Sequence, residues 1–573
     1  MTAAAAGAGW RYARCRRTTP QRAPLGGPTG RPGDCGRLRC QARKRTPSQL
    51  PEWRLMHTIP HLRRVLASLA VAATAIGLTA CGGGGSSDSP APPTPVPTPA
   101  PTQVPRLDES RCPYTLHPSQ QLSTGVRCGE LVVLQDRSNP SGPTVRIPFA
   151  VFKPATASSR APVFYLTGGP GQTWTEVLAQ VPAGFSPGFN GGAKLPRDEV
   201  VLEQRGSIAT TPALACANTG SSWGPESFRD PTAELSVVLP ALRACADGLI
   251  ANGVQPRNFT TDDMADDVED LRRLLGYDKV VLNGVSFGTN WGLAMLRRHG
   301  TRVDSMVLDS VVSPAVFPLR GDAQAYDSAF SALAAACAAQ PACAARYPDL
   351  DDRVSTLFDR LNAMPLPWQG GPGNEANANV ALSVLGQTAA FSPSSFPRLV
   401  AEMERWVNAG QVPSTLPQFI EDILIDDSSL RQTFGQLLSV TCADNATTTE
   451  AELAASVLQV RPSLRPARTS VNQSIYALCG AWPYRKDLPA SAFLPVTSAV
   501  NTLILSGTFD PLTPPSWAQQ VASTLPNTTV VSFPTRGHSV QNGSACSNAI
   551  VRAFLAGQAV DPSCAAAEAL AFE

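Results

Sequence analysis

Short apolar runs rich in β-branched residues recur along most of the chain, and segments with helical spacing separate several of them. Val163–Leu166 and Val280–Leu282 are two such runs. The segment before the second, ADDVEDLRRLLGYD, has acidic residues first, arginines later and Gly276 near its end, which is typical of a helix. The other runs are Leu131–Leu134, Val145–Phe152, Val200–Leu202, Met306–Leu308, Leu503–Leu505 and Thr529–Phe533. Alternating strands and helices predict an α/β fold, a mostly parallel sheet with helices on both faces.

The strand pattern fades between about residues 316 and 495. This region is rich in Ala, Leu and polar residues, with helical spacing in DSAFSALAAACAA and AEMERWVNAG. We therefore expect a helical cap at 316–495, inserted between the two parts of a sheet domain at 108–315 and 496–573. A chain of 573 residues is long for one domain, but an α/β domain with an inserted cap reaches this size.

The first 80 residues differ in character from the rest. Residues 1–55 contain eleven arginines and one lysine against two acidic residues, a net charge of +10, and have no apolar period. After Met56, two arginines precede the apolar stretch Val65–Ala80, whose length suits a signal peptide at 56–80 and is short for a membrane span. We expect residues 1–55 to lie upstream of the true start at Met56; a long basic signal region is the alternative.

The apolar stretch ends in LTAC, which resembles the lipobox of bacterial lipoproteins. The resemblance implies cleavage before Cys81, lipid attachment to Cys81 and a membrane-anchored lipoprotein of the cell envelope, on the periplasmic face of the outer membrane or on the cell surface. A secretory signal with a chance cysteine is the alternative. Residues 81–107 are rich in Gly and Ser and contain eight prolines between Pro90 and Pro105, so we expect an extended tether.

Charge and cysteine content restrict the partners further. Because the formal charge is +2 and Arg63 and Arg64 add to the basic N-terminal segment, the residues after 80 carry −10, which disfavours binding to nucleic acid. Ten cysteines follow Cys81, an even number that favours disulfides in an exported chain. Local closure favours neighbour pairs: Cys112–Cys128, Cys216–Cys245, Cys337–Cys343, Cys442–Cys479 and Cys546–Cys564. No CxxC unit is present, and we expect no metal and no cofactor.

One serine stands in a sequence typical of a catalytic nucleophile. Gly284-Val285-Ser286-Phe287-Gly288 matches G-x-S-x-G, in which a serine occupies a sharp turn between a strand and a helix. A chance match is the alternative, but the apolar strand KVVLN enters the motif and the apolar helix TNWGLAMLRR leaves it. This context predicts Ser286 as the nucleophile, which then needs a general base.

The base can be found by elimination among five histidines. His57 and His61 lie in the signal peptide, and His117 lies before the sheet. His299 is thirteen residues along the helix after the serine, roughly 20 Å from it. His538 remains, in the loop FPTRGHS after the last predicted strand. The orienting acid should follow a strand end between serine and histidine, which favours Asp510 in TLILSGTFDPLTPP over Asp309 in MVLDSVV. A capping or turn aspartate is the alternative for either.

An oxyanion formed at the serine would need two backbone N–H donors. We expect one from Phe287, the residue after the nucleophile, and one from Gly169 in the glycine-rich loop FYLTGGPGQ. Glycines let backbone groups approach a substrate closely, although a simple Gly-Pro turn would have the same sequence.

Eight segments together resemble one known family. TGGPG, EQRGS, GVSFGTNWG, MVLDSVVSP, VTCADN, LCGAWP, GTFDPLTPP and RGHS are similar to the proline iminopeptidase and tripeptidyl aminopeptidase group of α/β-hydrolases, above all its secreted tripeptidyl-aminopeptidase-like branch, over about residues 110–566. The resemblance implies an α/β-hydrolase fold and the triad Ser286, Asp510 and His538. Thr167 stands where the family usually has histidine, and Glu203 where aspartate is common, so the substrate can differ.

We therefore expect a serine exopeptidase that hydrolyses bonds near the free amino terminus of peptides. An esterase or lipase-like hydrolase on the same fold and a non-catalytic binding lipoprotein are the alternatives. Selection of an amino terminus requires a carboxylate for the substrate ammonium, and Glu203 and Asp444 are candidates, although either can be a structural acceptor. The cap would lie over Ser286, because loops at the carboxyl ends of the strands surround the site, and would block a passing polypeptide.

Overall fold

The computed structural model describes residues 103–109, 111–121, 125–188, 192–216, 231–315, 318–368, 375–416, 433–484, 488–542 and 544–573. The expected extension (1–55), the signal peptide (56–80), Cys81 and most of the tether (81–107) lie outside these residues. None of the helices within them is long and apolar enough to span a bilayer.

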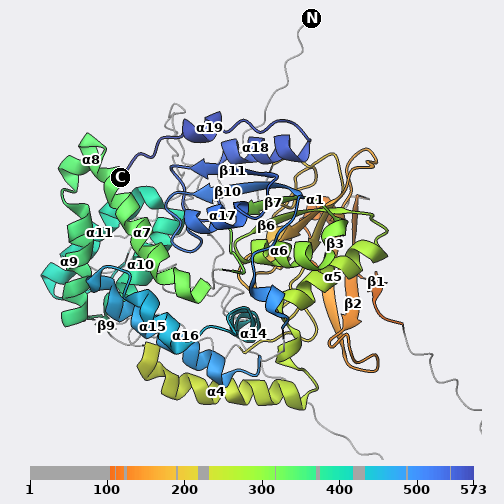
Figure 1. The fold of residues 1–573 in the computed structure, drawn as a ribbon, viewed down its shortest axis with the longest axis horizontal. Coiled ribbons are helices and arrows are strands. Elements are labelled where there is room, and N and C mark those ends of the chain that lie inside the picture. The colour runs from red at the N-terminus through yellow and green to blue at the C-terminus, as the bar shows by residue number, and fades with distance from the viewer. Residues whose placement is uncertain are drawn as a thin grey trace, which may run out of the picture. The chain divides into compact units, whose positions relative to one another are not determined.

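A nine-stranded sheet forms the centre of the described chain, in the order β1-β2-β3-β5-β4-β6-β7-β10-β11 (Figure 1). Its strands are β1 Arg106–Asp108, β2 Val126–Leu134, β3 Thr144–Phe152, β4 Val163–Leu166, β5 Glu199–Leu202, β6 Val280–Val285, β7 Val303–Asp309, β10 Asn501–Gly507 and β11 Thr528–Phe533. The pairings from β1 to β5 are antiparallel, and those from β5 onward are parallel. The predicted mostly parallel sheet is confirmed, and each predicted apolar run lies within one strand.

The edge strand β1 is the one strand of this sheet that the apolar pattern did not predict. It has only three residues, two of them charged, and pairs with β2 in antiparallel register. It also overlaps the end of the tether expected at 81–107, since the first strand of the described residues begins at Arg106. A short polar edge strand gives no hydrophobic signal, because its side chains are not enclosed by a core.

Helices cover both faces of the sheet, as the apolar strands require. Along β4, Phe164 and Leu166 join one buried cluster, and Val163 and Tyr165 join another on the opposite face. The first cluster includes residues of α5 Thr261–Leu274, α6 Phe287–His299 and α17 Pro515–Ala522. The second includes residues of α2 Thr175–Leu178, α18 Ala545–Leu555 and α19 Ser563–Ala566.

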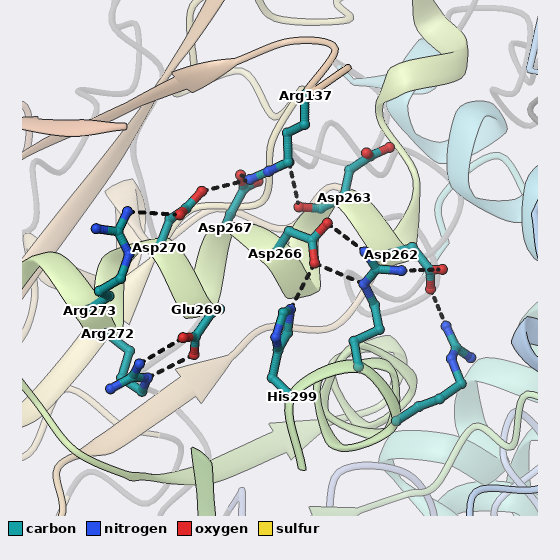
Figure 2. Close-up of polar contacts among 12 residues, drawn as sticks. Arg137, Asp262, Asp263, Asp266, Asp267, Glu269, Asp270, Arg272, Arg273 and His299 are labelled. Carbon is teal, nitrogen blue, oxygen red and sulfur yellow. Dashed lines mark hydrogen bonds and ion pairs between the residues drawn. The ribbon is translucent and has the colours of Figure 1, made fainter. Parts of the chain in front are cut away.

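Ion pairs hold α5 against α6, the helix that follows Ser286 (Figure 2). Asp266 on α5 accepts hydrogen bonds from Arg298 Nε and Nη2 at 2.8 and 2.7 Å, and His299 Nε2 lies 2.8 Å from Asp266 Oδ1. Asp267, also on α5, accepts from Arg205 through both oxygens at 2.7 and 2.6 Å, and both side chains are buried. His299 is therefore engaged at the far end of α6 from Ser286.

The cap is a set of helices with an apolar core of its own, drawn to one side of the sheet in Figure 1. Its helices are α7 Pro318–Ala338, α8 Pro341–Arg346, α9 Leu350–Ala363, α10 Ala378–Phe391, α11 Phe396–Ala409, α14 Phe434–Asp444, α15 Glu450–Val457 and α16 Arg465–Ala481, with a small pair of strands, β8 Leu366–Pro367 and β9 Glu375–Ala376. Phe509, which follows β10, is buried in the same core and ties the cap to the sheet domain.

One helix of the expected sheet domain packs mainly on helices of the cap. In α4, Pro231–Ala251, Val238 and Leu242 share a buried cluster with Phe434 and Leu438 of α14. Among the described residues, five disulfides join the neighbour pairs named above: Cys112–Cys128, Cys216–Cys245, Cys337–Cys343, Cys442–Cys479 and Cys546–Cys564. Two of these disulfides belong to this cluster. Cys216–Cys245 joins α4 to the segment after β5, and Cys442–Cys479 joins α14 to α16.

Candidate active site

Ser286 lies in a strained turn between β6 and α6. Its backbone has φ 55° and ψ −127°, outside the regions that L-residues usually adopt. Both flanking glycines are required by close backbone contacts: a Cβ on Gly288 would lie 2.0 Å from the carbonyl oxygen of Leu166, and one on Gly284 would lie 2.4 Å from that of Gly288. The turn exposes the Ser286 side chain at the carboxyl end of the parallel strands.

His538 and Asp510 follow the two neighbouring strands β11 and β10. His538 Nδ1 lies 2.8 Å from Asp510 Oδ2, and the side chains are 4% and 0% exposed. Burial would lower the pKa of the imidazole, but the Asp510 carboxylate, by its charge and this hydrogen bond, raises the pKa of His538 above its ordinary value. Burial would likewise raise the pKa of Asp510, but His538 and hydrogen bonds from Thr513 hold it below its usual range.

Thr513 is a member of this site that the sequence analysis missed. Its Oγ1 donates to Asp510 Oδ2 at 2.6 Å and lies 3.1 Å from His538 Nδ1, and its backbone N–H donates to Asp510 Oδ1 at 2.9 Å. The signal that could have found it is a hydroxyl three residues after the acid in FDPLT, a spacing at which an aspartate commonly bonds the following turn. Thr513 therefore orients the carboxylate that binds the imidazole.

Asp309, the other candidate acid, anchors the histidine loop instead of binding the ring. Its Oδ1 accepts from Val540 N at 2.9 Å and its Oδ2 from Gln541 N at 2.7 Å. Its backbone oxygen accepts from Ser286 N at 2.9 Å, so one residue joins the serine turn to the loop of His538. Burial raises the pKa of Asp309.

The serine and histidine side chains are not hydrogen-bonded to each other among the contacts of the described residues, although both segments are anchored at Asp309. Ser310 Oγ adds a second anchor, since it accepts from Ser539 N at 2.8 Å. In enzymes without substrate such nucleophile–base contacts are often long, and they shorten in the substrate complex. The geometry therefore shows the His538–Asp510 pair directly and places Ser286 beside its loop.

The glycine-rich loop after β4 lies against the serine. A Cβ on Gly168 would be 3.1 Å from Ser286 Cβ. Gln204 shapes this loop from below: its Nε2 donates to Gly168 O at 2.7 Å and to Thr167 Oγ1 at 2.8 Å, and its Oε1 accepts from Gly171 N at 2.9 Å. The N–H of Gly171 is thus already engaged. The N–H of Gly169 has no partner among the described residues.

Glu203 and Asp444 are both buried carboxylates, in different places. Glu203 Oε1 accepts from Thr173 Oγ1 at 2.8 Å and Trp174 N at 2.9 Å, just after the glycine loop. The buried hydroxyl groups of Tyr114 and Ser207 also interact with this carboxylate. Burial raises the pKa of Glu203 to about 7. The structure does not bring Glu203 and Asp444 together. Glu203 binds the segment after the glycine loop, whereas Asp444 binds side chains of α5 and α6.

Asp444 ends α14 and faces the helix that carries the serine turn. Its carboxylate accepts from Asn290 Nδ2 at 2.9 Å and from Thr261 Oγ1 at 2.7 Å. Burial raises its pKa to about 7. Asn290 lies about one helical turn after Ser286, and Asp444 lines a small cavity together with Asn290 and Arg297. No group of three or more His, Cys, Asp or Glu side chains within the described ranges is arranged to hold a metal ion.

Several known proteins are similar to this chain. Residues 200–542 match the model of the alpha/beta hydrolase fold family. The chain is 24% identical over 480 residues to serine protease Hip1 of Mycobacterium tuberculosis (78% of this chain and 88% of the relative) and 26% identical over 488 residues to carboxylesterase B of the same species (79% and 88%). A crystal structure of proline iminopeptidase from Mycobacterium smegmatis is 17% identical with a TM-score of 0.31, covering 72% of this chain and 95% of that one. The matched family model spans more than half of the chain, which therefore belongs to the alpha/beta hydrolase fold family.

Proposed function

We propose that this hydrolase is a serine exopeptidase that cleaves peptide bonds near the free amino terminus of peptides. The observation that carries the serine-hydrolase part of the proposal is the buried 2.8 Å contact between His538 Nδ1 and Asp510 Oδ2, in a loop anchored to the strained turn of Ser286. Asp510 fixes the imidazole tautomer with Nδ1 protonated, so that Nε2 is available as the base.

In the proposed reaction Ser286 Oγ attacks the scissile carbonyl carbon while His538 Nε2 takes the hydroxyl proton. The backbone N–H groups of Phe287 and Gly169 stabilise the resulting oxyanion. His538 then gives the proton to the leaving amine, the C–N bond breaks, and an acyl-enzyme remains on Ser286. Water attacks this ester with His538 again acting as base. This step releases the amino-terminal fragment as a carboxylic acid and restores the serine.

Two features support selection of a chain end. The cap meets the sheet domain directly at the histidine loop, since the backbone N–H of His538 donates to the carbonyl oxygen of Ala390 in α10 at 2.7 Å, and a cap there leaves little room for a continuous chain. Asp444 and Glu203 are the carboxylates proposed to pair with the substrate ammonium. Burial raises the pKa of both carboxyl groups to about 7, and a substrate ammonium placed beside either one would favour its ionised form.

An esterase is the second candidate, because a relative named carboxylesterase B is as similar to this chain as the relative named as a serine protease. Both reactions use the same nucleophile, base and oxyanion donors. They differ in whether binding depends on a free substrate amine, which an ester of a simple acid lacks.

Acetylation of the substrate amine separates the two reactions. Purified protein is incubated with aminoacyl- and tripeptidyl-amides, with their amino-acetylated forms and with short acyl esters, and Ser286→Ala serves as the inactive control. We expect cleavage of the free-amine substrates and at least a hundredfold lower kcat/KM for the acetylated ones, since an unpaired buried carboxylate costs about 3 kcal/mol or more. Equal cleavage of both forms would favour the esterase.

We also propose that the protein is exported and anchored to a membrane through lipid on Cys81, with the tether at 81–107 holding the hydrolase away from the bilayer. The support is the LTAC sequence at the end of the apolar stretch. Metabolic labelling with a fatty acid tests this: the wild type should incorporate label and fractionate with membranes, whereas Cys81→Ser should do neither. Equal labelling of both would exclude lipidation at this residue.

A further inference from the structure

The last residue of cap helix α10 is a half-exposed phenylalanine beside the proposed base. Phe391 is 46% exposed, although the residues before it on α10, including Leu385, Ala389 and Ala390, are buried. The ring of Phe391 stands edge-on to that of His538, with 5.9 Å between centroids and an angle of 86°. A large apolar side chain thus lies next to the imidazole with one side open to solvent.

Backbone contacts fix the end of α10, from which this ring extends. The N–H of His538 donates to the carbonyl oxygen of Ala390 at 2.7 Å, one residue before Phe391. Gly537 allows this approach, since a Cβ there would lie 2.3 Å from Ala389 O and 2.4 Å from Ala390 O. The end of α10 and the histidine loop therefore form one unit, which keeps the backbone of Phe391 beside His538.

The chemistry of acyl transfer says which part of a substrate this ring meets. His538 Nδ1 is taken by Asp510, so Nε2 is the atom that delivers a proton to the leaving group. The leaving amine must come within hydrogen-bond distance of Nε2, and the first residue of the leaving segment then lies beside the imidazole. The acyl segment, in contrast, lies toward the oxyanion donors and α6.

We propose that Phe391 forms the apolar wall of the leaving-group subsite and selects substrates with a large apolar residue directly after the scissile bond. This proposal rests on the proposed function. An apolar side chain in that position covers the exposed part of the ring, and removal of both from water stabilises the complex. A glycine or a charged residue gains nothing from the contact. The expected substrates are therefore peptides whose first released residue on the carboxyl side is Leu, Phe or a similar residue.

The test compares leaving groups within one mixture. Peptides share one free-amine acyl segment and carry Leu, Phe, Ala, Gly or Asp as the first leaving residue, and mass spectrometry gives the ratio of their kcat/KM values, which is independent of the amount of active enzyme. We expect the wild type to prefer Leu or Phe over Gly about tenfold. Phe391→Ala should reduce this ratio to within about twofold, and Phe391→Leu should keep most of it.

Phe185→Ala is the matched control, because Phe185 is also 46% exposed but belongs to the loop between α2 and β5. It should leave the ratio unchanged. The proposal is overturned if Phe391→Ala keeps the wild-type ratio, or if it slows all substrates by one factor, since the ring would then only position the histidine.

If the wild type cleaves esters but no peptides, the proposed function fails separately, and the subsite is tested with benzyl and ethyl esters of one acid. Loss of a benzyl preference in Phe391→Ala supports the subsite, and an unchanged ratio of benzyl to ethyl ester cleavage refutes it.

Discussion

At the scale of single residues, three consecutive side chains after β5 each hold a different segment of the site. Glu203 binds the backbone at Trp174, Gln204 binds the glycine loop, and Arg205 binds Asp267 on α5. Alternate residues of an extended chain point to opposite sides, so one short segment can reach three partners. The EQRG motif therefore supports the glycine-rich loop and α5, the helix beside α6, through its side chains.

The first prediction concerns the two candidate acids. Asp510→Asn should lower kcat about 10⁴-fold, because an amide stabilises the wrong tautomer and no longer supports the imidazolium. Asp309→Asn should lower kcat much less and thermal stability more, because Asp309 accepts two backbone N–H groups of the histidine loop and does not bind the ring. Steady-state kinetics and thermal unfolding of both variants check this, and the reverse order of kcat values would make Asp309 the orienting acid.

The second prediction concerns Thr513 and the pH profile. Since the pKa of His538 is raised and catalysis needs the neutral imidazole, kcat/KM of the wild type should rise with pH through a value above 6.5. Thr513→Val removes a hydrogen bond to Asp510 Oδ2 and leaves more carboxylate charge to stabilise the imidazolium, so this acidic limb should move to higher pH. The free energy of unfolding should fall by roughly 1–3 kcal/mol.

Thr513→Ser keeps the hydroxyl group and is the control for Thr513→Val. Its acidic limb should coincide with that of the wild type. An unshifted limb in Thr513→Val, or equal shifts in both variants, would show that the hydroxyl does not act on the Asp510–His538 pair.

The sequence was enough to propose Ser286, His538 and Asp510, for physical reasons that do not extend to their supports. A strained turn needs small residues at fixed positions, which leaves a motif, and only five histidines compete for the role of base. Thr513, Ala390 and Phe391 carry no such mark. Their relation to His538 depends on how α10 packs against the sheet domain, and the apolar pattern of a helix does not encode its neighbour across an interface.

At the scale of elements, the contact between α10 and the loop after β11 is the hardest to predict from the sequence. Parallel strands were predictable because burial on both faces gives continuous apolar runs. Helix α4 was placed with the sheet domain by its position in the chain, yet it packs on α14 and α16. Hydrophobic periodicity predicts that a helix has a buried face without predicting which surface covers it.

The third prediction tests this junction. Gly537→Ala places a methyl group against two backbone oxygens of α10, which cannot move aside as a flexible side chain could. The loop should shift, the bond from His538 N to Ala390 O should lengthen, and kcat should fall at least tenfold, since small displacements of a catalytic base are costly. Gly480→Ala is the control, because a Cβ at Gly480 meets nothing within 4 Å. Equal kcat values in the two variants and the wild type would show that the junction does not position the base.

At the scale of the whole described chain, the residues after α19 connect the sheet domain to the cap. The disulfide Cys546–Cys564 joins α18 to α19, and the following segment reaches the cap, where Leu570 and Phe572 pack against its apolar core. Glu573 accepts from Ser395 Oγ and Arg398 Nε, both at 2.8 Å. Figure 1 shows this end of the chain beside α7 and α8. Residues 567–573 therefore form a strap, a segment that connects the sheet domain to the cap. The sheet domain and the cap also meet at His538.

The last prediction is that removal of residues 569–573 loosens the cap. Loss of two partly buried apolar side chains should lower the free energy of unfolding by roughly 2–4 kcal/mol, and the anchoring disulfide stays in place. If the cap is what excludes a continuous chain, the truncated protein should also begin to cleave an amino-acetylated, internally quenched polypeptide that the wild type leaves intact. Urea unfolding and this assay are run together with Phe185→Ala, which removes an exposed ring elsewhere. Reduced stability without new cleavage would show that the strap stabilises the cap but that the cap does not impose end selection.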